Sequence, residues 1–172
     1  MIPTSYGRAG DTLFIHGARN SRMLNVLEEG GEICLTVTIV DGLVLARSAF
    51  HHSVNYRSVV VFGKAKVVGK PKEKSNALRA ITEHIIPGRW ADVRKPTPEE
   101  MAATIVLSIE LREASAKVRT GPPVDAEGDY GLPVWAGILP IKSVRGKPIR
   151  DPRLRKTIRI PGYLSGNTRP PS

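Results

Sequence analysis

The residues best suited to bind an anion lie in the turn between His16 and Arg22. A strand is predicted to end at Gly17, and a helix is predicted to begin near Ser21. The first N–H groups of a helix and its dipole attract anions, while Ser21 and Arg22 add a hydroxyl and a guanidinium. These residue types in this order predict a phosphate-binding turn. A capped helix with two solvated arginines, Arg19 and Arg22, explains the same residues.

A second group of polar side chains, residues 47–59, lies between two apolar segments. Its hydroxyl, imidazole, amide and guanidinium groups, together with aromatic rings, are typical of a site for a polar, aromatic ligand. An ordinary polar connection between strands would contain the same residue types, so both interpretations stay open. We expect no metal site, because adjacent His51 and His52 would face opposite sides of a strand. The single cysteine, Cys34, excludes a disulfide framework and a cysteine-based cluster.

Composition and charge narrow the class of protein. The chain has 172 residues, 41% of them hydrophobic, which predicts one globular domain and at most two. No apolar run approaches the roughly 20 residues of a membrane span, and the first residues do not resemble a signal peptide, so we expect a cytoplasmic protein.

Nine basic residues and one acidic residue in 142–172 contribute +8 of the net charge of +10. Proline is frequent there, so we expect an extended basic segment, and its single aromatic residue, Tyr163, argues against nucleic-acid binding.

Hydrophobic periodicity predicts the elements that must position these residues. Strands are expected over Asp11–Gly17, Glu32–Val40, Leu43–Phe50, Arg57–Val68, Thr104–Leu111, Ala116–Arg119 and Val134–Ile141, and helices over 19–29, over 72–86 and after Thr97. The Asp41-Gly42 pair between two apolar runs predicts a hairpin turn. Met23, Val26 and Leu27 share one face of the first helix. This order of elements indicates an antiparallel barrel of the α+β type.

Five segments occur in an order and spacing typical of one protein family: 16–23, 41–59, 63–65, 114–123 and 133–140. Together they resemble the pyridoxamine 5′-phosphate oxidase-like flavin-binding proteins, and within them the branch related to nitroimidazole-resistance proteins. The similarity covers most of residues 2–141.

The resemblance implies an α+β, mainly β fold, namely a six-stranded antiparallel split β-barrel with short flanking helices. Such proteins form homodimers and bind FMN at the subunit interface. The implied organisation is an FMN-binding domain over residues 1–141, shortened at its N-terminus, followed by the basic extension over 142–172. Family members carry about one further helix and strand before the residue equivalent to Ile2. The first strand is therefore expected to be missing, which leaves an edge for a dimer partner to cover unless the sequence is truncated.

The resemblance also implies site residues. The flavin phosphate would lie against Ser21 and Arg22, and the strand that begins at Arg57 would run along the flavin. The full set of residues expected to bind FMN is Ile2, Pro3, Thr4, His16, Gly17, Ser21, Arg22, Met23, His51, Tyr56, Arg57, Ser58, Lys117, Arg119 and Trp135. The expected function is a flavin-dependent oxidoreductase acting on an unknown small molecule. The alternatives are a non-catalytic flavin or haem carrier or sensor, and a β-barrel that binds nucleic acid through its basic tail.

Overall fold

The computed structural model describes residues 2–164, which form two compact units. Among these residues, the first unit comprises 2–33, 62–113 and 145–164, and the second comprises 34–61 and 114–144. Each unit is built on one four-stranded sheet.

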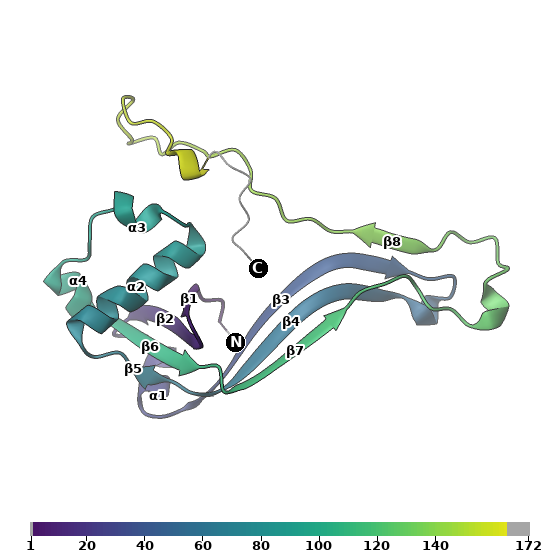
Figure 1. The fold of residues 1–172 in the computed structure, drawn as a ribbon, viewed down its shortest axis with the longest axis horizontal. Coiled ribbons are helices and arrows are strands. Elements are labelled where there is room, and N and C mark those ends of the chain that lie inside the picture. The colour runs from purple at the N-terminus through teal and green to yellow at the C-terminus, as the bar shows by residue number, and fades with distance from the viewer. Residues whose placement is uncertain (1, 165–172) are drawn as a thin grey trace. The chain divides into compact units, whose positions relative to one another are not determined.

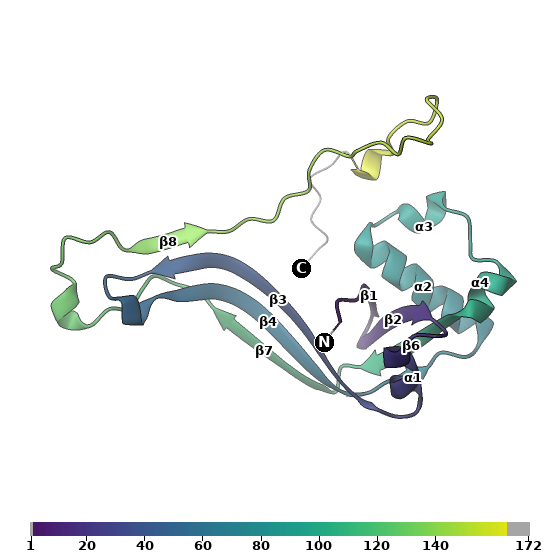
Figure 2. The same cartoon turned by 180° about the vertical axis from the view of Figure 1, so that it is seen from behind.

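The sheet of the first unit has the strand order β1-β2-β6-β5 and is packed against helices (Figure 1). Its strands are β1 (Tyr6–Ala9), β2 (Thr12–Ala18), β6 (Thr104–Glu110) and β5 (Lys66–Val67), and its helices are α1 (Arg22–Glu28), α2 (Pro71–Ile85), α3 (Arg89–Asp92) and α4 (Pro98–Ala103). The core combines alternate residues of β2 and β6, such as Ile15 and Leu107, with Ala77 and Ile81 of α2. Figure 2 shows the same sheet and helices from behind.

A glycine allows the longest helix to approach the sheet. A Cβ added at Gly7 in β1 would lie 2.4 Å from the backbone nitrogen of Ile81 and 2.5 Å from the carbonyl carbon of Ala80. Because both atoms belong to the α2 backbone, any larger residue at position 7 would push β1 and α2 apart.

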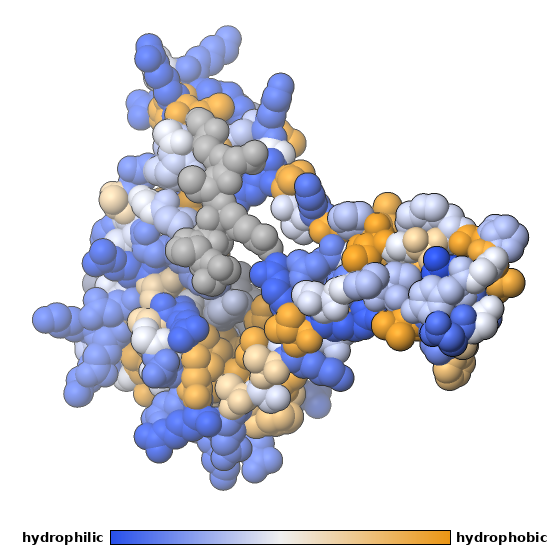
Figure 3. Space-filling view, turned by 45° about the vertical axis from the view of Figure 1, so that its right-hand side comes forward, coloured by the Kyte–Doolittle hydropathy of each residue, from blue (hydrophilic) through white to orange (hydrophobic). Residues whose placement is uncertain are grey.

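The second sheet has the order β7-β4-β3-β8, and β3, β4 and β7 run side by side as long curved ribbons (Figure 1). Its strands are β3 (Glu32–Leu45), β4 (Ser53–Lys64), β7 (Glu113–Arg119) and β8 (Gly137–Pro140). One-turn 3-10 helices lie at Ala49–His51 and Glu127–Asp129 in the connections, and a third, Gly162–Leu164, belongs to the first unit. Large apolar side chains stay exposed on this unit (Figure 3), among them Ile39, Val59, Val118 and Leu139.

The structure confirms a mixed α+β fold composed mainly of strands in antiparallel sheets. The strands of the described residues number eight and are divided between two sheets, whereas the family resemblance implied six strands in one split barrel. The helices over 72–86 and near Arg22 are confirmed. The strand expected over 57–68 is divided between β4 and β5, close to Gly63, whose φ is 155°.

The hairpin predicted at Asp41-Gly42 is wrong. Both residues lie inside β3, where Gly42 pairs with Pro140 of β8. A Cβ at Gly42 would lie 3.0 Å from a side-chain carbon of Ile138 and 3.1 Å from the carbonyl oxygen of Leu139. The glycine therefore allows β8 to pair closely with β3 and does not supply the positive φ of a turn.

The N-terminal part of the chain contains a strand that hydrophobic periodicity did not indicate. Ile2, Pro3 and Thr4 form no strand, and the first strand is β1, which the sequence analysis did not predict. With four residues and a central glycine, β1 is too short for an alternating pattern to identify it.

Candidate functional site

Helix α1 positions the arginine that was expected to bind phosphate. Ser21 is its N-cap, and the Ser21 hydroxyl accepts a hydrogen bond from the backbone nitrogen of Leu24 at 3.5 Å. Leu24 and Leu27 are buried and attach the helix to the first unit. A Cβ at Gly17 would lie 2.7 Å from Cδ1 of Leu24, so the glycine in β2 allows this packing. Gly17 therefore positions the helix that carries Arg22.

Three of the predicted residues line one hollow beside α1. This hollow has a volume of about 450 Å³ and is lined by Ile2, Arg22, Met23, Val26, Leu27 and Glu32. A volume of this size lies within the range of small-molecule sites. The structure thus brings Ile2 together with Arg22 and Met23, although Ile2 lies in no regular element.

The three apolar residues that the sequence places on one face of α1 are not buried together. The residues buried in α1 are Leu24 and Leu27, whereas Val26 is 53% exposed and Met23 is half-buried. A helix of seven residues has too few positions for periodicity to identify its buried face. Val26, Leu27 and Glu32 are lining residues that the sequence analysis missed.

The hollow contains one guanidinium and one carboxylate. Arg22 and Glu32 both line it, and within residues 2–164 no ion pair joins them. Arg19, by contrast, is bound elsewhere: its Nε donates to the carbonyl oxygen of Ala102 at 3.1 Å and its backbone nitrogen donates to that of Ala103 at 3.0 Å. Of the two arginines in the predicted anion-binding turn, only Arg22 lines the hollow.

The other predicted residues of the first unit do not line this hollow. His16 lies in β2 opposite Val106 of β6, and partial desolvation by the surrounding protein lowers the pKa of its exposed imidazole. Pro3 and Thr4 are exposed, and the Thr4 hydroxyl donates to the carbonyl of Ser5 at 3.4 Å.

In the second unit, Ser58 is held by a neighbouring hydroxyl. The Ser58 Oγ and Thr38 Oγ1 atoms are hydrogen-bonded at 2.8 Å between β4 and β3. Because side chains alternate along a strand, Tyr56 and Ser58 face one side of β4 and Arg57 faces the other. The predicted flavin contacts on β4 therefore do not share one face.

The face that carries Arg57 is organised by charge pairing. Arg57 donates from Nε and Nη2 to the two carboxylate oxygens of Asp41, both at 2.9 Å. These hydrogen bonds raise the pKa of Arg57. Asp41 was missed because the sequence analysis placed it in a turn, whereas its position on β3 makes it a cross-strand partner of Arg57.

Arg119 has a neutral partner. Its Nη1 donates to Oδ1 of Asn55 at 2.6 Å, and the Asn55 amide donates in turn to the carbonyl oxygen of Gly121 at 3.1 Å. Lys117 lies two residues earlier on the same face of β7 and is exposed. These contacts leave Arg119 and Lys117 without a carboxylate partner among the described residues.

Two aromatic positions complete the predicted set. His51 is half-buried, and its ring lies 5.2 Å from that of Phe50 in an edge-on arrangement. Trp135 is 69% exposed, and its indole lies over Gly137, where a Cβ would approach the ring to 2.9 Å.

A buried ion pair fixes the segment before His51. The Asp125 side chain is fully buried and accepts from the backbone nitrogens of Arg47 and Ser48 at 2.9 and 3.3 Å and from Arg47 Nη1 at 3.1 Å. Burial alone would raise the pKa of Asp125, but these hydrogen bonds outweigh it and hold the pKa below its ordinary value. The Arg47 guanidinium also lies 5.1 Å from the ring of Tyr130. This network was not predicted, since its two halves are 78 residues apart in sequence.

Residues 2–164 contain neither a cluster of metal-ligating side chains nor a membrane-spanning helix. No group of three or more His, Cys, Asp or Glu side chains there is placed to hold a metal ion. In the same residues, no helix is both long and apolar enough to cross a membrane.

Comparisons with known proteins identify the family. The family model described as pyridoxamine 5′-phosphate oxidase matches residues 1–118, and the chain belongs to this family. No protein with a curated description matches the chain.

Two solved structures are similar over nearly the whole chain. The flavocytochrome Anf3 from Azotobacter vinelandii is 41% identical with a TM-score of 0.89, over 95% of this chain and 76% of that one. The FAD and heme binding protein from Mycobacterium smegmatis is 37% identical with a TM-score of 0.92, over 97% and 82%. A putative 5-nitroimidazole antibiotic resistance protein from Bacteroides thetaiotaomicron, 20% identical with a TM-score of 0.55 over 67% and 66%, shares the fold.

Proposed function

We propose that this protein binds a flavin, with Arg22 as the residue that holds the flavin phosphate, and that it is a flavin-dependent oxidoreductase. The observation that carries this proposal is the hollow beside α1, which Arg22 lines together with the apolar residues Ile2, Met23 and Val26. A guanidinium without a carboxylate partner, next to an apolar wall, suits a ligand with a phosphate and a flat organic body. Family membership and the two flavin-binding structures of similar fold support the same proposal.

A bound flavin would supply electron or hydride transfer, and the protein would supply its position and surroundings. Arg22 would bind the phosphate, and Ser21 and Gly17 would hold α1 so that Arg22 keeps its place beside the hollow. Glu32 lines the same hollow, and its carboxylate would weaken the binding of an anion there by charge repulsion. A ligand with fewer negative charges at this end is therefore favoured.

The resemblance implies that the strand with Arg57 and Ser58 runs along the flavin and that Lys117, Arg119 and Trp135 are lining residues from a partner subunit, and we retain these assignments as proposals. His51 and Tyr56 also remain in the proposed set of FMN-binding residues. The geometry adds one distinction: Arg57 is neutralised by Asp41, whereas Lys117 and Arg119 keep their positive charge for an anionic group.

We also propose that the protein acts as a cytoplasmic homodimer. Apolar side chains exposed on the second unit, such as Ile39, Val59 and Leu139, are the kind of surface that a subunit interface covers. Light scattering coupled to gel filtration measures the mass directly. A monomer at every concentration tested would refute the dimer and leave the phosphate site to be tested separately.

FMN is the flavin that we propose, and FAD together with haem is the second candidate. The second candidate rests on the two similar structures, which are described as a flavocytochrome and as an FAD and heme binding protein. Releasing the cofactor from purified protein and separating FMN from FAD by chromatography decides the flavin. A Soret band in the absorption spectrum would establish haem.

Turnover separates an oxidoreductase from a carrier or sensor. Anaerobic mixing of the flavin-loaded protein with NADH or NADPH, followed by re-oxidation with air or an added acceptor, tests for it. The oxidoreductase is supported if the flavin absorption is lost on reduction and returns on re-oxidation, and if both steps are faster than those of free flavin. A flavin that is bound but not reduced faster than free flavin supports the carrier.

A further inference from the structure

The C-terminal part of the described chain folds into a loop that is attached to α3. The Tyr163 hydroxyl donates to Oδ2 of Asp92 at 2.6 Å and accepts from Nη1 of Arg89 at 3.0 Å. The loop is closed by Arg150, whose Nη2 donates to the carbonyl oxygens of Arg155 and Ile158 at 2.6 and 3.0 Å. This basic segment therefore has a defined local structure in spite of its proline content.

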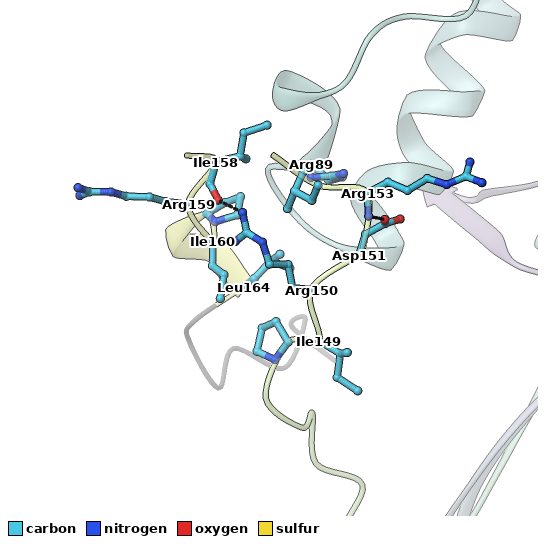
Figure 4. Close-up of a pocket in the computed structure, with 12 residues that line it drawn as sticks. Arg89, Ile149, Arg150, Asp151, Arg153, Ile158, Arg159, Ile160 and Leu164 are labelled. Carbon is cyan, nitrogen blue, oxygen red and sulfur yellow. Dashed lines mark hydrogen bonds between the residues drawn. The ribbon is translucent and has the colours of Figure 1, made fainter. Parts of the chain in front are cut away.

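The loop and Arg89 enclose a hollow of about 570 Å³ (Figure 4). Its walls are mainly apolar, with Leu154, Ile158, Ile160 and Leu164 among the lining side chains. Leu154, Ile158 and Ile160 remain 38%, 40% and 52% exposed, so an apolar ligand would remove surface that the fold itself leaves in contact with water. The volume lies within the range of small-molecule sites.

The hollow also carries positive charge that the protein does not neutralise. Four arginines line it (Arg89, Arg150, Arg153 and Arg159) against the single carboxylate of Asp151, which accepts from the backbone nitrogen of Arg153 at 2.6 Å. None of these arginines forms an ion pair within residues 2–164. Arg89 and Arg150 bind a phenol and two carbonyl groups, which are neutral and leave N–H donors of both guanidinium groups available. In Figure 4, Arg153 and Arg159 extend away from the hollow, while Arg150 is directed at the carbonyl of Ile158 within it.

We propose that this hollow binds a small molecule with an apolar body and a carboxylate head group, with Arg89 and Arg150 binding the carboxylate. Charge complementarity selects the anion, and the isoleucine and leucine side chains select the apolar body. No aromatic side chain lines the hollow, so it lacks the stacking surface that single-stranded nucleic acids use. The site shares no residue with the hollow beside Arg22, so the result of testing one proposal does not decide the other.

The full-length protein can be titrated with 1-anilinonaphthalene-8-sulfonate, an aromatic anion that fluoresces when bound, and with its uncharged analogue N-phenyl-1-naphthylamine. We expect saturable binding of one anilinonaphthalene sulfonate per chain, displacement by laurate but not by dodecanol, and binding of the neutral analogue that is roughly tenfold weaker. The key variant is Ile160→Glu, which places a carboxylate on the wall at a position already half exposed. Thr157→Glu adds the same charge three residues away, outside the lining, and is the matched control.

The proposal requires Ile160→Glu to weaken binding of the anionic dye roughly tenfold while Thr157→Glu leaves it nearly unchanged. Equal effects of the two variants would overturn it, because the dye would then respond to net charge alone. Equal affinity for the neutral and charged dyes, or no saturable binding by the wild type, would also overturn it. Displacement by an oligonucleotide with a steep salt dependence, and not by laurate, would replace it with nucleic-acid binding.

Discussion

Gly7→Ala tests the packing of β1 against α2, because the added methyl group meets backbone atoms. It would lie 2.4 to 2.6 Å from the nitrogen and Cα of Ile81 and the carbonyl carbon of Ala80, and backbone atoms cannot rotate away. Overpacking of this kind costs about 1–3 kcal/mol. Replacing glycine reduces the entropy of the unfolded chain, which offsets about 0.4–1 kcal/mol. The expected net loss in the free energy of unfolding is therefore about 0.6–2 kcal/mol, or a fall in Tm of roughly 1–8 °C for a chain of this length.

The assay is thermal or urea unfolding followed by tryptophan fluorescence. The chain has two tryptophans, and in a Trp135→Phe background only Trp90, in α3 of the same unit as Gly7, reports the transition. Gly69→Ala is the matched control, since no atom lies within 4 Å of its added methyl group and its φ is not positive. The reasoning is refuted if Gly7→Ala unfolds at the wild-type temperature, or if both variants lose equal stability.

Three further predictions concern α1, acid stability and the hollow beside Arg22. Gly17→Ala will lower the free energy of unfolding by about 1 kcal/mol, since the added methyl group meets the buried side chain of Leu24. In a double-mutant cycle, Gly17→Ala combined with Leu24→Ala will lose less stability than the sum of the two single losses. Glu100 has its pKa lowered from 4.5 to about 2, chiefly by its hydrogen bonds from Arg94, so its contribution to stability is complete above pH 4.5 and is lost as the pH falls towards 2. Glu100→Gln will make urea unfolding less pH-dependent in that window, and an unchanged pH profile would contradict the assignment. Glu32→Gln will tighten flavin binding by removing a negative charge from the hollow, and weaker binding in a fluorescence titration would show that Glu32 is a ligand contact.

The parts of the fold that the sequence predicted are those set by local chemistry. The predicted helix starts near Ser21 and after Thr97 are both present, and they depend on a cap at Ser21 and a capping box of Thr97 and Glu100, whose partners lie three residues apart. Helix α2 has fifteen residues, enough for its apolar stripe to identify it.

The features that the sequence did not predict depend on contacts between distant segments. Asp41-Gly42 has the composition of a turn, but pairing with β8 keeps it extended, and this leaves Asp41 to bind Arg57. The sequence grouped Val26 with Met23 and Leu27 on one helix face, whereas packing buries Leu24 and Leu27 and leaves Val26 53% exposed. Likewise, nothing local to the basic segment indicates that Tyr163 will bind α3 and help to form a hollow.

The central claim is that Arg22 binds the flavin phosphate, and it is tested most directly by titrating FMN into flavin-free protein while following the quenching of flavin fluorescence. Arg22→Gln is compared with Arg19→Gln, which removes the same charge at a position three residues earlier. Arg19 donates to the carbonyl oxygen of Ala102 and does not line the hollow. The account predicts saturable binding by the wild type, a dissociation constant roughly tenfold higher for Arg22→Gln, and little change for Arg19→Gln. Equal dissociation constants for the two variants, or a larger increase for Arg19→Gln than for Arg22→Gln, would contradict it.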